Sequence, residues 1–206
     1  MSIETEDAAA NDRDIQAELD RPGAGIPWLE MQFGKFGLRL LASRTSRDAA
    51  LEGYVRSAEQ VLRLVGDLDE AHGKKRVLVP RMRFMEDSSR YWSPYMIVEH
   101  LCLIDGPLLA LVRLLSTGRT SDRVASTAAV KPSPEAGPES LEKFRGIVAD
   151  WNSQLPTAEK LLDSALHPHP WFGPMNAHQW LCLAAQHHGV HRKQLDAVLA
   201  PTSGKS

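Results

Sequence analysis

The fold class follows from a stretch in the middle of the chain, Trp92-Ser93-Pro94-Tyr95-Met96-Ile97-Val98-Glu99-His100-Leu101. Ser93 is a residue type that caps a helix, and Pro94 suits the first helical position because its missing N–H is not needed there. Apolar residues then recur at steps of four and three, which places them on one helix face: Ile97, Leu101, Ile104, Leu108, Leu111 and Leu115. The stretch therefore predicts a long amphipathic helix that starts at Pro94.

Three other segments show the same spacing, at residues 47–71, 139–166 and 176–199. Pro156 is expected to kink or split the second of them, because proline cannot donate a helical hydrogen bond. Asn176 and Gln179 resemble a capping box at the start of the last one. A shorter helix is expected from Pro27 to about Leu41. With four long helices and no convincing strand, the predicted fold is an all-α four-helix bundle.

The connection between the second and third bundle helices, residues 117–138, is rich in proline, glycine and serine and has no hydrophobic period. Such a long loop inside a domain needs a reason. If the flanking helices run parallel, the chain must return along a whole helix, about 36 Å for 24 residues. Twenty extended residues reach about 66 Å, enough for that return. We therefore expect a long crossover between parallel helices; a domain boundary is the competing explanation.

The chain divides into a flexible N-terminal arm (residues 1–25), one helical bundle (26–200) and a C-terminal tail (201–206). Hydrophobic residues make up 43% of the sequence and charged residues 24%, which excludes general disorder. The formal net charge of -2 gives no reason to expect nucleic acid or an anionic membrane as a partner.

The expected compartment is the cytoplasm. The N-terminus is acidic and lacks the basic and apolar regions of a signal peptide, and no uninterrupted apolar run approaches the ~20 residues of a membrane span. Cys102 and Cys182 each lie inside an apolar run, which favours buried, reduced thiols over a disulfide framework.

Three of the eight histidines fall where an interior stripe would carry an apolar residue. His100 is on the inward face of the helix that starts at Pro94. His187 and His191, one turn apart, share the inward face of the last helix, whereas His188 is rotated by ~100° from His187. Each histidine alone fits a core residue with one hydrogen bond. Together they predict a site for one divalent metal ion, because three neutral imidazoles bind such an ion and leave positions open.

The sequence also resembles a known family, the DinB-like superfamily. The stretch Trp92–Leu101 is similar to its second-helix motif, and His187-His188-Gly189-Val190-His191-Arg192-Lys193-Gln194-Leu195 is similar to its fourth-helix motif, His-x-x-x-His-Arg-x-Gln. His169-Pro170-Trp171-Phe172-Gly173-Pro174-Met175 is similar to the entry to that last helix. The resemblance covers roughly residues 47–200. It implies a bundle with an up-down-down-up course and a three-histidine metal site at His100, His187 and His191.

Known members of this family include thiol-dependent transferases and a mycothiol-dependent isomerase. The resemblance therefore implies an enzyme of the thiol-transferase or hydrolase type, with one divalent ion (Zn or Ni) as its cofactor and a small molecule, such as a low-molecular-weight thiol, as its substrate. No general base is identified. A non-catalytic bundle that binds a metal or small ligand is the alternative, and an interaction module that has lost its site is a third. The sequence does not decide between a monomer and a homodimer.

Two further groups of residues accompany the cluster. For Glu99 we expect a solvated or supporting role, with direct catalysis as the alternative. For Gln194 we expect an orienting hydrogen bond. The aromatic residues near the histidines favour packing over a pocket mouth: Tyr91, Trp92, Tyr95, Trp171 and Trp180. The remaining histidines of that region, His167, His169 and His178, are expected to be loop and cap residues.

Overall fold

The computed structural model describes residues 12–200. Its helices are α2 (Trp28–Arg44), α3 (Arg47–Gly66), α4 (Glu70–Lys74), α5 (Pro94–Leu115), α6 (Glu139–Gln154), α7 (Ala158–Leu162) and α8 (Ala177–Leu199), with 3-10 turns η1 (Asp87–Ser89) and η2 (Ala128–Val130). The strands are β1 (Val77–Leu78), β2 (Tyr91–Trp92), β3 (His167–His169) and β4 (Gly173–Met175). Residues 12–18 are also helical.

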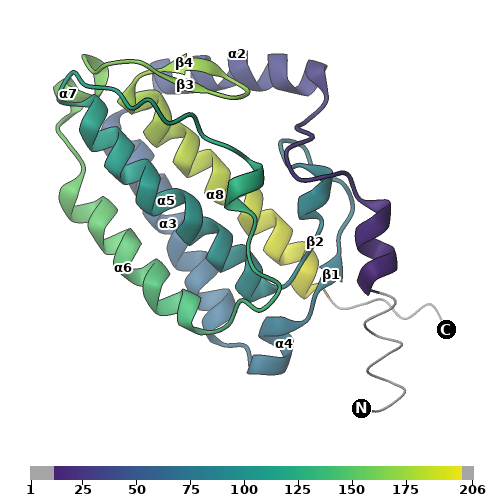
Figure 1. Ribbon diagram of the computed structural model, residues 1–206. Coiled ribbons are helices and arrows are strands. Elements are labelled where there is room, and N and C mark those ends of the chain that lie inside the picture. The colour runs from purple at the N-terminus through teal and green to yellow at the C-terminus, as the bar shows by residue number, and fades with distance from the viewer. Residues whose placement is uncertain (1–11, 201–206) are drawn as a thin grey trace, which may run out of the picture.

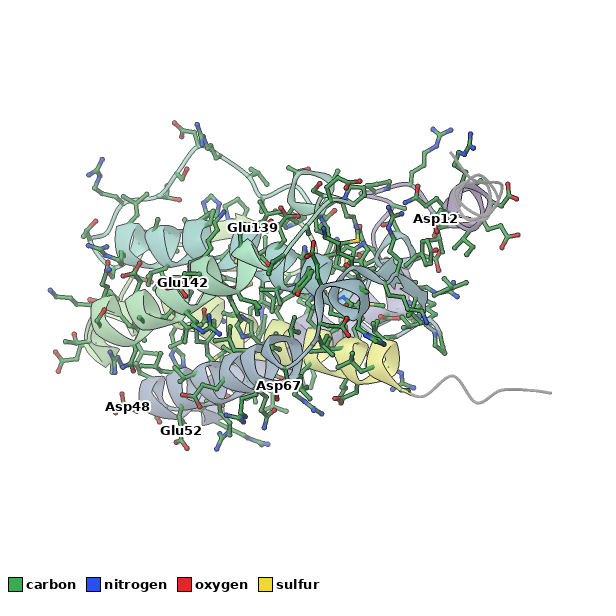
Figure 2. All side chains as sticks on the ribbon, turned by 90° about the horizontal axis from the view of Figure 1, so that it is seen from below. Asp12, Asp48, Glu52, Asp67, Glu139 and Glu142 are labelled. Carbon is green, nitrogen blue, oxygen red and sulfur yellow. The ribbon has the colours of Figure 1, made fainter. Side chains whose placement is uncertain are left out.

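Four helices form the bundle that the sequence predicts. α3 packs against α6 and α8, and α5 packs against the same two helices (Figure 1). The apolar stripes meet between them, so that side chains such as Val61, Ile97, Phe144 and Leu195 are fully buried. Acidic residues of α3 and α6 project outward, among them Asp48, Glu52, Asp67 and Glu142 (Figure 2). The all-α four-helix bundle is thus confirmed.

The helix ends are set by the residues that the sequence analysis identified. The Ser93 side chain accepts a hydrogen bond from the Met96 backbone N–H (3.2 Å), and Asn176 accepts one from Gln179 (2.9 Å) in a complete capping box. These bonds satisfy backbone donors that have no partner inside the helix. The expected split near Pro156 is present, because α6 ends at Gln154 and α7 starts at Ala158.

Two small antiparallel sheets were not expected from the sequence. β1 pairs with β2, with Val77 opposite Trp92, and β3 pairs with β4 as a hairpin before α8. Pairs of two or three residues carry no alternating pattern long enough to detect. Trp92, which belongs to the β1–β2 pair, packs against His100, with ring centroids 4.8 Å apart.

The crossover, residues 117–138, runs back along the bundle before α6 begins (Figure 1). Ala165, after α7, donates a backbone hydrogen bond to the Leu115 carbonyl oxygen at the end of α5 (3.1 Å). Arg113, in the last turn of α5, donates to the Gln154 side chain at the end of α6 (2.5 Å), which joins the ends of the two helices and supports a parallel course. The up-down-down-up order of the four helices stays a prediction.

Part of the expected arm lies among the described residues. The backbone N–H groups of Gly23 and Gly25 donate to the Glu86 carboxylate (3.3 and 3.2 Å), and that of Asp20 donates to Asp87 (3.1 Å). Residues 20–25 are therefore docked on the segment that precedes β2. Residues 1–11 and 201–206, which include the predicted tail, lie outside the described residues, and the domain boundaries stay predictions.

One described helix, α5, is long and apolar enough to cross a membrane by length and composition. Most of it is buried inside the bundle, where it packs against α6 and α8, so its apolar character has a structural explanation. Cys102 and Cys182 are buried and free, in agreement with the expectation of reduced thiols.

Candidate metal centre

The structure brings together the three histidines that the sequence analysis selected. His100 comes from α5, and His187 and His191 come from consecutive turns of α8. His187 Nε2 lies 3.3 Å from His100 Nε2 and 3.0 Å from His191 Nε2. His100 and His191 are buried and His187 is half-buried. Three imidazole nitrogens thus converge on one point between α5 and α8.

The partners of the other ring nitrogens determine which nitrogen of each ring carries the proton. His100 Nδ1 lies 2.7 Å from the Val130 carbonyl oxygen, which can only accept, so Nδ1–H donates. His191 Nδ1 lies 2.7 Å from Gln194 Oε1. The Gln194 amide cannot be reversed, because its nitrogen donates to the Ser89 carbonyl oxygen (2.7 Å). In the neutral rings the Nε2 atoms of His100 and His191 therefore carry lone pairs.

The surroundings keep the three rings neutral. Burial lowers the pKa of His100 well below its usual value, and the neighbouring His191 lowers it further. Burial likewise lowers the pKa of His187 far below its usual value, with added repulsion from His191 and His100. Burial lowers the pKa of His191 to about 4. Neutral imidazole is the form that binds a metal ion.

His187 cannot satisfy both neighbours. A neutral ring has one proton, so a proton on its Nε2 serves only one of the two facing lone pairs, and a proton on its Nδ1 serves neither. His187 Nδ1 is buried and has no hydrogen-bond partner among the described residues. At least one nitrogen lone pair therefore faces the lone pair of a neighbouring ring without a hydrogen between them. Because a buried, unsatisfied polar group is costly, the arrangement fits a cation at the point of convergence.

The distances fit such an ion as well. Imidazole nitrogens bind Zn²⁺ at about 2.0–2.1 Å, and two ligands of a tetrahedral ion at that distance lie roughly 3.3 Å apart. Two of the three separations, 3.3 and 3.0 Å, agree with this value to a few tenths of an ångström, and the three ligand atoms all lie within 4.8 Å of one another. The backbone and amide acceptors on Nδ1 are the partners that hold metal-binding histidines in orientation.

An ion pair and an aromatic ring border the cluster. Trp92 packs on His100 and stacks on His191, with ring centroids 4.8 and 5.9 Å apart. The Lys131 ammonium lies 5.4 Å from the Trp92 ring and 2.9 Å from the Glu86 carboxylate. Burial opposes the charge on Glu86, but Lys131 holds the pKa of that carboxyl below its usual value. The pair therefore adds little net charge beside the histidines.

His188 points away from the cluster and takes part in a second polar group in the core. Its Nε2 lies 2.5 Å from Asp105 Oδ2, and both side chains are fully buried. The Tyr54 hydroxyl donates to the same carboxylate (3.1 Å), and the pKa of Tyr54 is raised by burial and by Asp105. The Trp151 indole N–H donates to the Asp105 backbone oxygen (3.1 Å). This group links α3, α5, α6 and α8.

The other singled-out residues are mostly structural. Glu99 accepts a hydrogen bond from the Ser133 backbone N–H (2.5 Å) and so anchors the crossover. Tyr91, Trp92, Tyr95 and Trp180 are buried, and Trp180 and Trp171 also border a cavity. His178 donates to carbonyl oxygens at the end of α2, as expected for a cap residue. His167 and His169, expected in a loop, instead form the ends of strand β3 and border the cavity.

A cavity of about 910 Å³ opens beside the cluster. Its walls come from α2, α5, α8, the crossover and the β3–β4 hairpin, and all three histidines of the cluster border it. A volume of this size is at the upper end of the range for small-molecule sites. The three-histidine cluster is thus accessible to a ligand from the cavity.

Sequence reasoning missed two features of this region. The Val130 carbonyl, on the crossover thirty residues after His100, could not be found because backbone acceptors leave no sequence signal. The Asp105–His188 pair had a weak signal: Asp105 is a carboxylate within an apolar helix, and a buried carboxylate requires a partner. Gln194, in contrast, has the orienting hydrogen bond that the motif predicts.

The family model of the DinB superfamily matches residues 54–195. A solved structure described as "Crystal structure of TT2238, a four-helix bundle protein" is similar to 73% of this chain and 97% of its own, at 26% identity and a TM-score of 0.47. No curated protein matches.

Proposed function

The chain belongs to the DinB superfamily, and we propose that it binds one divalent metal ion through His100, His187 and His191. The observation that carries the proposal is the convergence of three Nε2 atoms, of which two are fixed as lone-pair donors by Val130 and Gln194. Nitrogen ligands favour a borderline ion, and Zn or Ni is the proposed identity. Three protein ligands leave at least one position for a small molecule.

We further propose that the protein is a metal-dependent enzyme of the thiol-transferase or hydrolase type. A bound divalent ion acts as a Lewis acid and lowers the pKa of a thiol or water that binds it. The residues of the chain then have separate tasks: the three histidines hold the ion, Val130 orients His100, Gln194 orients His191, and Trp92 excludes water from one side of these two rings. The cavity admits the small-molecule substrate to the open side.

A cobalt titration tests the thiol version of this proposal. Co²⁺ replaces Zn²⁺ in nitrogen sites and gives a visible spectrum that changes with its ligands. Addition of 2-mercaptoethanol to the cobalt protein should produce a sulfur-to-cobalt charge-transfer band in the near ultraviolet. A spectrum that does not change on addition of the thiol would contradict the thiol version and leave the hydrolase version, in which water is the activated group.

A non-catalytic protein that binds a metal or small ligand is the second candidate. It is favoured by the ion pair of Glu86 and Lys131, because a carboxylate held below its usual pKa beside an ammonium is a poor general base. The two candidates differ in turnover. Zn- or Ni-loaded protein should consume a thiol and an electrophile, or hydrolyse an ester or amide, faster than the chelator-treated protein if the enzyme proposal holds.

We propose a second copy of the chain as the macromolecular partner, and neither nucleic acid nor a membrane; the cytoplasm remains the proposed compartment. The outward face of α2 carries Leu29, Phe33, Phe36 and Leu40 at steps of four, three and four, and the two phenylalanines are 71% and 70% exposed. Trp28 extends this face at 66% exposure. An antiparallel pair of α2 helices would place each phenylalanine against the other.

The size of this face supports such a dimer. A fully buried aromatic side chain covers about 150–250 Å². The three aromatic side chains of this face are about two-thirds exposed, and together with the two leucines they offer roughly 500 Å² of surface. A standard interface buries about 800 Å² per partner, so the α2 face supplies the larger part of one. No charged residue interrupts the stripe from Leu29 to Leu40, because Lys35 and Arg39 lie on its flanks.

A further inference from the structure

The cavity beside the three histidines has an uneven chemical character. α5 contributes eight residues to its described wall, and His100 is the polar one; the others are Leu103, Ile104, Pro107, Leu108, Ala110, Leu111 and Leu114. From His100 to Leu114 the helix rises about 21 Å at 1.5 Å per residue. The wall is therefore an apolar surface several helical turns long, with the metal-binding cluster at one end.

The facing walls are similar. α2 contributes Leu38 and Leu41 to the cavity, and α8 contributes Leu183 and Ala184 on the turns that precede His187. Gly34 and Gly37 of α2 also border it; a Cβ atom at position 34 would meet Phe84 at 2.9 Å, whereas one at position 37 would meet nothing within 4 Å. The open position at Gly37 and the leucines of the other walls border an unfilled space next to the cluster.

Charged groups that would recognise a polar ligand are scarce along this space. Glu86 and Lys131 border the cavity, but they bind each other (2.9 Å) close to Trp92. Arg123 is the remaining charged residue of the described wall, and it is exposed on the crossover. A ligand with many charges would lose its hydration here without gaining ionic partners.

We propose that the substrate is an amphipathic small molecule. Its apolar body lies along α5 between Ile104 and Leu114, and its one polar, metal-binding group reaches the histidines. This assignment of a substrate class rests on the proposed function, because the polar group needs the ion as its partner. The apolar body gains free energy from leaving water, in proportion to the area that the cavity covers.

A homologous series of ligands tests the assignment on the metal-loaded, full-length protein. Straight-chain hydroxamic acids from two to ten carbons carry the same metal-binding group on an apolar tail of increasing length. Each buried methylene should tighten binding about fourfold, measured by isothermal titration calorimetry, until the cavity is filled. Equal affinities for acetohydroxamic and decanohydroxamic acid would overturn the proposed substrate class.

A pair of glycine variants identifies the cavity as the place where the tail binds. Gly37→Phe places a large side chain at the open α2 position. It should weaken the binding of decanohydroxamic acid at least tenfold and leave the affinity for acetohydroxamic acid unchanged. Gly146→Phe is the matched control, because Gly146 is also a helical glycine with nothing within 4 Å of its Cβ position, and it lies on α6, away from the cavity. Equal weakening by both variants would contradict binding along α5.

A metal-free arm separates this proposal from the proposed function. Decanol and butanol are titrated into chelator-treated protein. Tighter binding of decanol without any metal binding to the parent protein would support the apolar cavity and contradict the metal site. Metal binding without any dependence of ligand affinity on tail length would support the metal site and contradict the apolar cavity as the place where the tail binds.

Discussion

Gln194 holds His191 through a 2.7 Å hydrogen bond from the imidazole Nδ1–H to the amide oxygen, while its amide nitrogen donates to the Ser89 backbone. Gln194 is fully buried, so this bridge is not exchanged for water. It fixes both the orientation of the ring and the nitrogen that carries the lone pair. A residue three positions after His191 thus sets which of its ring nitrogens is free to bind an ion.

Replacement of Gln194 tests this role. Gln194→Met keeps the length of the side chain and removes both hydrogen bonds. We expect the dissociation constant for Zn²⁺, measured by competition with a chromophoric chelator, to rise about 10- to 100-fold. Arg192→Met is the control, since Arg192 belongs to the same motif but binds Asp196 on the surface. An unchanged affinity in the Gln194 variant would show that His191 needs no orienting partner.

Two His–Asp pairs of this chain allow a comparison of buried and exposed electrostatics. The Asp105–His188 pair is fully buried, whereas the Asp69–His72 pair is more than half exposed on both sides. Removal of one member of the buried pair leaves the other without compensation. We expect His188→Ala to lower the free energy of unfolding by roughly 3–5 kcal/mol. His72→Ala should leave it nearly unchanged, because solvent screens the exposed pair.

Urea unfolding of metal-free protein measures both variants without a contribution from metal binding. A triple variant, Asp105→Leu, His188→Leu and Tyr54→Phe, should regain part of the lost stability because it also removes the Tyr54 hydroxyl, which would otherwise lose its acceptor in the core. If His188→Ala and His72→Ala unfold at the same urea concentration, the buried pair does not stabilise α5 against α8.

Much of the bundle could be predicted because its helices are long and their apolar residues recur at regular steps. The caps at Ser93 and Asn176 and the split after Gln154 are local features, and the sequence shows them directly. The three histidines were found for the same reason: each occupies a position where the helical stripe requires an apolar residue.

The features that were missed depend on contacts between distant segments. The β1–β2 pair is two residues long, and its hydrogen bonds join segments on either side of the 79–90 loop. The docking of residues 20–25 depends on the buried carboxylate of Glu86, which no local pattern identifies. The partners of Asp105 are 51 and 83 residues away along the chain. A single sequence contains no record of such pairings.

The outward face of α2 predicts the oligomeric state. The parent protein should elute with a mass near twice the 22.8 kDa of one chain in size-exclusion chromatography with light scattering. Phe33→Glu with Phe36→Glu places charges in the centre of the face and should give the mass of a monomer. Leu162→Glu is the control, because Leu162 is 60% exposed on α7. A parent protein that remains monomeric at high micromolar concentration would contradict the proposed dimer.

The metal content of the protein tests the central claim most directly. Inductively coupled plasma mass spectrometry should find about one Zn or Ni ion per chain in protein made without a histidine tag and reconstituted with the metal. His100→Ala, His187→Ala and His191→Ala should each lose it, since each removes one of three ligands. The control is His72→Ala on the surface, because His188→Ala, which helical rotation alone suggests, would disrupt the core pair with Asp105. A metal-free parent protein, or equal loss of metal from His72→Ala and His187→Ala, would contradict the account.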